Sequence, residues 1–178
     1  MRISRYVKVL VVLCALMLLV PVAAAADPGV AKERPFKVEF AGTFEITYPA
    51  IWCGLDSAGV TMTFTDGHGT HLGRLGGWAQ HCTNMDTGRV AGGAGYFEAA
   101  NGDRVNATYD GWIFPTEDPL VVDISCNHEY TGGSGRFANA DGEAIGSTWA
   151  VFDQSGTHGL VGGTLVGTIS YDASDRSD

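Results

Sequence analysis

Histidines are the side chains in this chain best suited to acid–base or metal chemistry near neutral pH, and the sequence contains five of them. His68 and His71 are three residues apart. On a strand such positions face opposite sides, so we do not expect this pair to bind a metal. His128 lies on the same strand face as Ile124 and Tyr130. Two interpretations stay open for it: a core histidine hydrogen-bonded to a neighbour, or a polar group that points into a ligand cavity.

Glu98 is the candidate acid, and with His128 it completes the pair of candidate catalytic residues. Glu98 shares a strand face with Tyr96, while Phe97 lies on the other face, and the pattern does not decide which face is inward. An inward Glu98 would be the best acid candidate, whereas an outward one would be solvated. The candidate ligand-binding residues are side chains on apolar strand faces, with core filling as the alternative: Tyr96, Tyr109, Cys126, His128 and Tyr130.

Three cysteines lie beyond the N-terminal segment. Cys53 follows the end of the first predicted strand and Cys82 ends the third. In an antiparallel meander these ends meet at one rim, so we predict a disulfide between Cys53 and Cys82. Cys126, in the middle of an apolar strand face, is the predicted buried free thiol. The sequence contains no zinc-finger spacing, nucleophile elbow, P-loop, dinucleotide fingerprint or HExxH motif, so we expect no metal and no cofactor.

The N-terminus has the features of a secretory signal peptide. Basic residues at positions 2, 5 and 8 precede an apolar run over 9–20, and alanines occupy 23–26. This pattern predicts cleavage before Asp27 and a secreted or periplasmic protein with no membrane association after cleavage. An uncleaved N-terminal anchor is the alternative. The whole chain has a net charge of −9, and loss of the basic leader makes it more negative. Nucleic acid and anionic membranes are therefore excluded as expected partners.

The remainder of the chain has the period-two alternation of β-strands. From Phe36 to Pro49 apolar residues alternate with polar ones. Asp66-Gly67 and Asn101-Gly102 are hairpin signals. We expect a flexible leader over 27–35, a single domain over 36–171 and a polar tail over 172–178. The domain is predicted to be an all-β, eight-stranded, antiparallel up-and-down barrel, with a β-sandwich as the alternative. The predicted strands cover 36–48, 60–65, 69–82, 89–100, 104–114, 120–130, 142–152 and 160–171.

One glycine-rich stretch carries a family resemblance. A GGxGxF pattern and a later glycine place Gly132, Gly133, Gly135, Phe137 and Gly142 between two predicted strands. Together with residues 67–74, 99–104 and 163–171, in that order, this motif resembles the bacterial secreted barrel proteins of the allene oxide cyclase and dirigent superfamily. The resemblance implies the eight-stranded barrel and a homo-oligomer, a trimer or a dimer.

The resemblance also bears on activity. Allene oxide cyclases isomerise a fatty-acid epoxide in a hydrophobic barrel without a cofactor, and their first strand carries a Tyr-Glu-x-Asn-Glu type motif. Here the corresponding strand, 38–46, lacks that motif, and Glu39 and Glu45 fall on its polar face. We therefore assign none of the family's catalytic residues to positions of this chain.

Three function hypotheses follow from these patterns. The leading one is an exported barrel that binds a small apolar ligand in its interior or serves as a rigid secreted module. The alternative is a cofactor-free isomerase or cyclase on a lipid-like or polyketide-like substrate. The third is an interaction protein that uses the outer face of the barrel.

Overall fold

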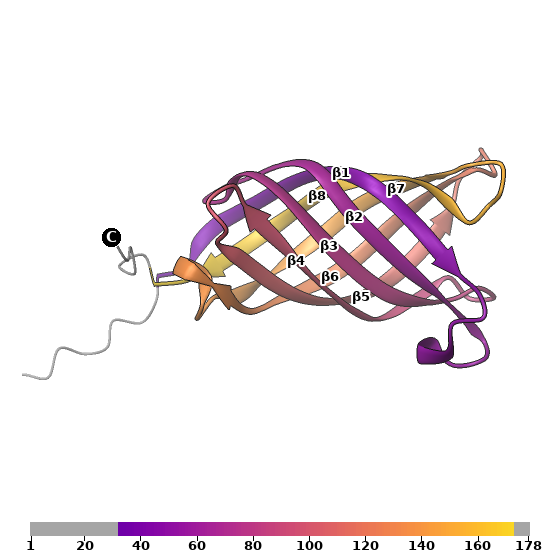
Figure 1. Ribbon diagram of the computed structural model, residues 1–178, viewed down its shortest axis with the longest axis horizontal. Coiled ribbons are helices and arrows are strands. Elements are labelled where there is room, and N and C mark those ends of the chain that lie inside the picture. Colours follow the sequence, from indigo (N-terminus) through magenta and orange to yellow (C-terminus); the bar gives the residue numbers. More distant parts are fainter. Residues whose placement is uncertain (1–31, 173–178) are drawn as a thin grey trace, which may run out of the picture. The chain divides into compact units, whose positions relative to one another are not determined.

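The architecture is a closed antiparallel barrel in which eight strands follow one another in sequence order (Figure 1). The computed structural model describes residues 32–172. The predicted all-β, eight-stranded up-and-down barrel is confirmed, and the alternative β-sandwich is wrong. The expected signal peptide lies outside the described residues. The strands are β1 (Arg34–Thr47), β2 (Ser57–Gly69), β3 (Gly73–Asn84), β4 (Arg89–Ala99), β5 (Arg104–Pro115), β6 (Val121–Ser134), β7 (Asp141–Phe152) and β8 (His158–Ser170), with short 3-10 turns η2 (Ile51–Cys53) and η3 (Gly135–Phe137).

Alternation of side chains across each strand separates the barrel interior from solvent. In β1, Phe36 and Val38 are buried, whereas Lys37 and Glu39 between them are exposed. β1 pairs with β2 on one side and with β8 on the other, which closes the sheet (Figure 1). Closure leaves no unpaired edge among the strands of residues 34–170 for another chain to extend. Between residues 32 and 172 no helix is long and apolar enough to cross a membrane.

Several strand boundaries differ from the predicted ones; β6, for example, continues to Ser134 and includes Gly132 and Gly133 of the glycine-rich motif. β1 begins at Arg34, so part of the expected leader belongs to the sheet. The predicted hairpin at Asp66-Gly67 is wrong, because β2 continues to Gly69 and the turn lies at 70–72. The register between β2 and β3 shifts after Phe64, while Gly67 still pairs with β1. The dipeptide is therefore accommodated as an irregularity inside a strand, as in a β-bulge.

Aromatic side chains close the end of the barrel where the described chain begins and ends. Phe36, Tyr130 and Phe137 are fully or almost fully buried there, and Tyr171 packs on Phe137 with ring centroids 4.8 Å apart. The glycine-rich motif makes this packing possible, because Gly132 has a φ of +91°, a conformation that side chains disfavour. The motif thus turns the chain tightly enough to insert the Phe137 ring.

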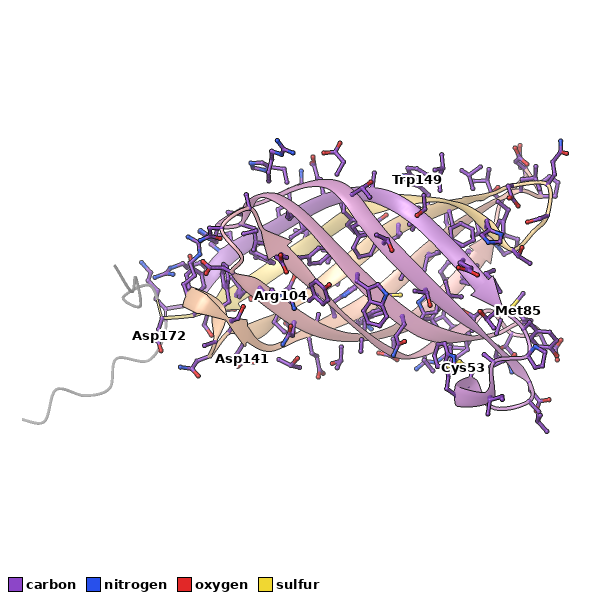
Figure 2. The ribbon with its side chains drawn as sticks, viewed as in Figure 1. Cys53, Met85, Arg104, Asp141, Trp149 and Asp172 are labelled. Carbon is purple, nitrogen blue, oxygen red and sulfur yellow. A yellow bond between two sulfur atoms is a disulfide. The ribbon has the colours of Figure 1, made fainter. Side chains whose placement is uncertain are left out.

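The opposite end carries the connection between β1 and β2. Cys53 and Met85 lie at this end, and Asp141 and Asp172 lie at the other (Figure 2). A disulfide joins Cys53 of η2 to Cys82 of β3. This bond holds the connection against the outside of β2, where the Trp52 ring occupies the space that a side chain at position 59 would need; residue 59 is glycine.

Loss of the disulfide should destabilise the barrel. The bond closes a loop with a sequence separation of 29 residues, for which unfolded-state entropy gives about 3–4 kcal/mol. We expect the Cys53→Ala/Cys82→Ala variant to lose that much free energy of unfolding in a urea titration. A thiol reductant should lower the stability of the wild type and leave the double variant unchanged. A wild type that is insensitive to reductant would contradict this role.

Candidate functional site

Two connected chambers occupy the barrel interior. The outer chamber has a volume of about 160 Å³ and the inner one about 50 Å³. Met62, His81 and Ile124 line both, so the chambers adjoin at these side chains. The other residues of the outer chamber include Phe44, Ile46, Val60, Thr83, Ile113, Val122, Ala150 and Phe152. Those of the inner chamber include Phe40, Phe64, Phe97, Tyr109, Cys126, His128 and Thr148.

The outer chamber lies at the disulfide-bearing end of the barrel. Met85, which is exposed and belongs to the β3–β4 turn, is one of its lining residues, and Figure 2 shows that residue at the barrel end. Ile51 and Leu55 of the neighbouring β1–β2 connection are 97% and 85% exposed. Because aromatic packing fills the opposite end, a ligand would reach the interior past this apolar rim.

Three of the residues expected to bind ligand meet in the inner chamber. Tyr109, Cys126 and His128 all line it, and the Tyr109 and His128 rings stack with centroids 5.0 Å apart. Glycines on neighbouring strands make room for them. A Cβ at Gly93 would lie 2.5 Å from the Tyr109 ring, and one at Gly146 would lie 2.9 Å from His128 Nε2.

The other candidate residues lie elsewhere. Glu98 forms an ion pair with Arg104 on the outer face, and the guanidinium of Arg104 stands 4.5 Å from the Tyr96 ring centroid. Although Tyr96 borders the inner chamber, its ring therefore packs outside. Tyr130 belongs to the closed end, where its ring meets Phe36 edge-on at 5.1 Å. The structure thus brings His128 to the cavity and leaves Glu98 in solvent.

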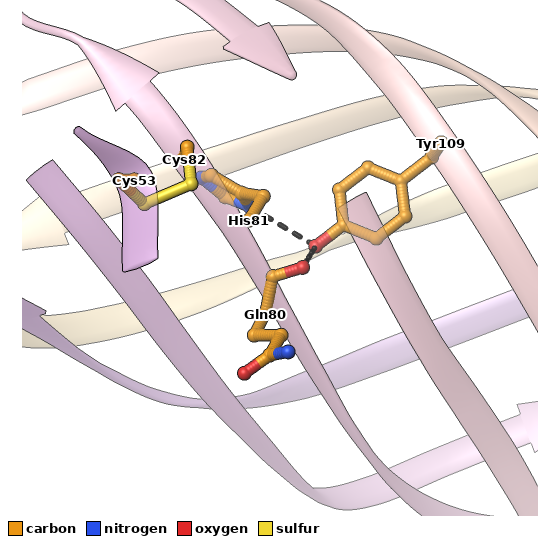
Figure 3. The surroundings of a disulfide bond; sticks show 5 residues. All are labelled: Cys53, Gln80, His81, Cys82 and Tyr109. Carbon is orange, nitrogen blue, oxygen red and sulfur yellow. Dashed lines mark hydrogen bonds between the residues drawn. A yellow bond between two sulfur atoms is a disulfide. The ribbon is translucent and has the colours of Figure 1, made fainter. Parts of the chain in front are cut away.

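His81 is a cavity residue that the sequence analysis did not single out. Its Nδ1 lies 3.0 Å from the Tyr109 hydroxyl, and that hydroxyl lies 3.2 Å from the carbonyl oxygen of Gln80 (Figure 3). The signal for it was present: counting in twos along β3 from Leu75 through Ala79 puts His81 on the buried face. The residue next to it, Cys82, points outward to the disulfide.

Burial keeps the cavity side chains uncharged at neutral pH. It lowers the pKa of His81 and of His128 to about 4, because a charged imidazolium would lose its hydration inside the barrel. Burial also raises the pKa of the Cys126 thiol to about 12 and raises the pKa of the Tyr109 phenol. A thiol in this state is a poor nucleophile.

The chemistry of the chambers is that of neutral hydrogen-bonding groups in an apolar wall. Among the described residues, no Asp, Glu, Lys or Arg lines either chamber. Within residues 32–172 no three histidine, cysteine or acidic side chains are grouped so that they could hold a metal ion. The arrangement can bind an uncharged molecule and orient it by hydrogen bonds.

Comparisons with known proteins give no relative on which to base a function. A scan against models of protein families, a search of curated proteins and a search of solved structures each found no match to this chain. The barrel architecture is therefore supported by the structure itself, and the resemblance to the allene oxide cyclase superfamily rests on the sequence motifs alone.

The buried histidines predict a loss of stability on mild acidification. Each has a pKa of about 4 in the folded protein and about 6.5 when unfolded, so the unfolded chain binds more protons between these values. The free energy of unfolding should fall as the pH is lowered from about 6.5 to about 4, by about 3 kcal/mol at most for each histidine. Below pH 4 these two groups add no further slope.

Urea titrations at a series of pH values would measure this dependence. The His128→Leu variant should lose roughly half of the slope, because one of the two shifted groups is gone. His68→Gln is the matched control, since His68 is exposed, and it should keep the slope. An unfolding free energy that does not change between pH 6.5 and pH 4 would show that neither histidine is held neutral by burial.

Proposed function

We propose that this protein binds a small, uncharged, apolar molecule inside the barrel. The observation that carries the proposal is the outer chamber, a space of about 160 Å³ walled by Phe44, Val60, Phe152 and other apolar side chains. An apolar cavity of about 150 Å³ is known to stay dry and to take up benzene. Transfer of an apolar ligand from water into such a space is favourable, at about 25 cal/mol per Å² of buried surface.

Binding fits the interior better than catalysis. The isomerase alternative needs an acid or base that can exchange a proton at working pH. Glu98, the candidate acid, pairs with Arg104 outside the barrel. His81 and His128, with pKa values near 4, stay deprotonated at neutral pH and are weak bases.

Export is part of the proposal. The signal-peptide pattern predicts a mature chain that begins at Asp27. The disulfide between Cys53 and Cys82 supports it, because such bonds persist in secreted and periplasmic proteins and are rare in the cytosol. The intact mass of protein purified from its native source should correspond to cleavage before Asp27. The mass of the full chain would contradict export by this route.

Ligand binding is tested with toluene, which suits the size of the outer chamber. A ligand at 100 times its Kd stabilises the folded state by about 2.7 kcal/mol, so saturating toluene should raise Tm by about 5–10 °C. The Ala150→Phe variant should lose the shift, because position 150 is buried and lines the outer chamber. Ser147→Phe is the matched control: it adds the same ring to an exposed position of β7 and should keep the shift.

Native mass spectrometry of the protein purified without denaturation complements this test. A small apolar molecule that copurifies with the wild type and not with Ala150→Phe would identify the natural ligand. An absence of any toluene-dependent change in Tm for the wild type would overturn the proposed function and favour a barrel that works through its surface.

A further inference from the structure

The position of His81 suggests which part of a ligand the cavity recognises. Its side chain is 4% exposed and lines both chambers. One ring nitrogen, Nδ1, is engaged by Tyr109, and the other, Nε2, lies on the ring edge away from Tyr109 (Figure 3). The protonation of these two nitrogens decides what His81 offers to a bound molecule.

Hydrogen-bond accounting assigns the proton of the neutral ring. The Gln80 carbonyl can only accept, so the single proton of the Tyr109 hydroxyl goes to it. The Tyr109 oxygen then has only lone pairs to offer His81, and Nδ1 must donate to it. A neutral imidazole has one N–H, so Nε2 carries a lone pair. The reverse arrangement would leave the Tyr109 and Gln80 oxygens facing each other at 3.2 Å without a proton between them.

Nε2 is thus an acceptor that no donor of the described residues engages. Among residues 32–172, the bond to Tyr109 is the one hydrogen bond that the His81 ring makes. Two positions along the same face of β3, the Thr83 hydroxyl is buried and has no partner in the part of the chain described. A buried polar group left without a partner costs about 1–3 kcal/mol. The free Nε2 of His81 and this unpartnered hydroxyl, both on residues in the wall of the apolar outer chamber, favour an occupant that supplies a hydrogen bond.

We propose that the cavity selects an uncharged, apolar molecule that carries a hydrogen-bond donor, a hydroxyl in the simplest case, and that this group donates to His81 Nε2. The inference rests on the proposed binding function and specifies its ligand class. The apolar body of the ligand would lie in the outer chamber against Phe44 and Phe152. A carboxylate or ammonium is disfavoured, because no charged side chain from residues 32–172 lines either chamber to pair with it.

Three probes with the same number of heavy atoms test the selection: 1-hexanol, which can donate; methyl pentyl ether, which can only accept; and heptane, which can do neither. We expect the wild type to bind the alcohol about tenfold more tightly than the isomeric ether, as measured by isothermal titration calorimetry. The His81→Leu variant removes the Nε2 acceptor, while the Tyr109 hydroxyl keeps its bond to the Gln80 carbonyl. This variant should bind the alcohol and the ether within twofold of each other, with the affinity for the ether unchanged.

The two proposals fail in different ways. If none of the three probes binds to the wild type, the proposed function fails and the ligand class fails with it. If all three bind but the wild type does not prefer the alcohol, the barrel is a container and the role of His81 is overturned. A preference that survives in His81→Leu would equally overturn it.

A spectroscopic measurement tests the assignment without any variant. A long-range ¹H–¹⁵N correlation spectrum of the wild type should show His81 with Nδ1 protonated and Nε2 unprotonated at pH 7. Addition of 1-hexanol should shift the Nε2 resonance, and heptane should leave it in place. A ring protonated at Nε2, or a Nε2 resonance that 1-hexanol does not move, would contradict the inference.

Discussion

The limited cross-section of an eight-stranded barrel is the constraint on which the rest of the structure depends. Such a barrel is just wide enough for its own side chains to fill it or for one small ligand. Every large inward side chain therefore needs a small one near it. The Phe40, Phe64 and Phe97 rings, with centroids 4.6–5.7 Å apart, occupy the middle of the barrel. Gly77, at the same level, leaves space for two of them: a Cβ there would lie 3.1 Å from Phe64 and 3.3 Å from Phe97.

The same constraint places the polar groups of the cavity. Tyr109 belongs to β5, yet its hydroxyl bonds to Gln80 and His81 of β3, with β4 between them. The ring reaches across because the strand in between has Gly93 directly beneath it. Any larger residue at position 93 would displace the Tyr109 ring. His81 Nδ1 would then lose the partner that determines which ring nitrogen carries the proton. A glycine on one strand thus determines the chemistry of a histidine on another.

Alternation in the sequence was enough to predict the strands, because period two is a property of each strand by itself; the closed barrel, with a β-sandwich as the alternative, followed from their number and the family resemblance. Alternation also placed Tyr109, Cys126 and His128 on inward faces. It could not separate Tyr109 from Tyr130, since both point inward and only the level along the barrel axis decides which one meets a cavity. That level depends on register, and alternation does not reveal the register shifts that follow Phe64 and Gln80. The hairpin predicted at Asp66-Gly67 was wrong because a dipeptide that favours turns can also be accommodated inside a strand as an irregularity.

The buried polar groups of the outer chamber are harder to explain as packing than as recognition. If the interior served only to hold the barrel together, apolar residues at positions 81 and 83 would fill it without the cost of unpartnered atoms. His81 instead has one nitrogen bound and the other free, and the Thr83 hydroxyl beside it is buried without a partner among residues 32–172. A hydrogen-bonding occupant would engage the free nitrogen of His81. Because aromatic packing closes the far end, such an occupant would arrive with its polar group leading and its apolar part toward the rim.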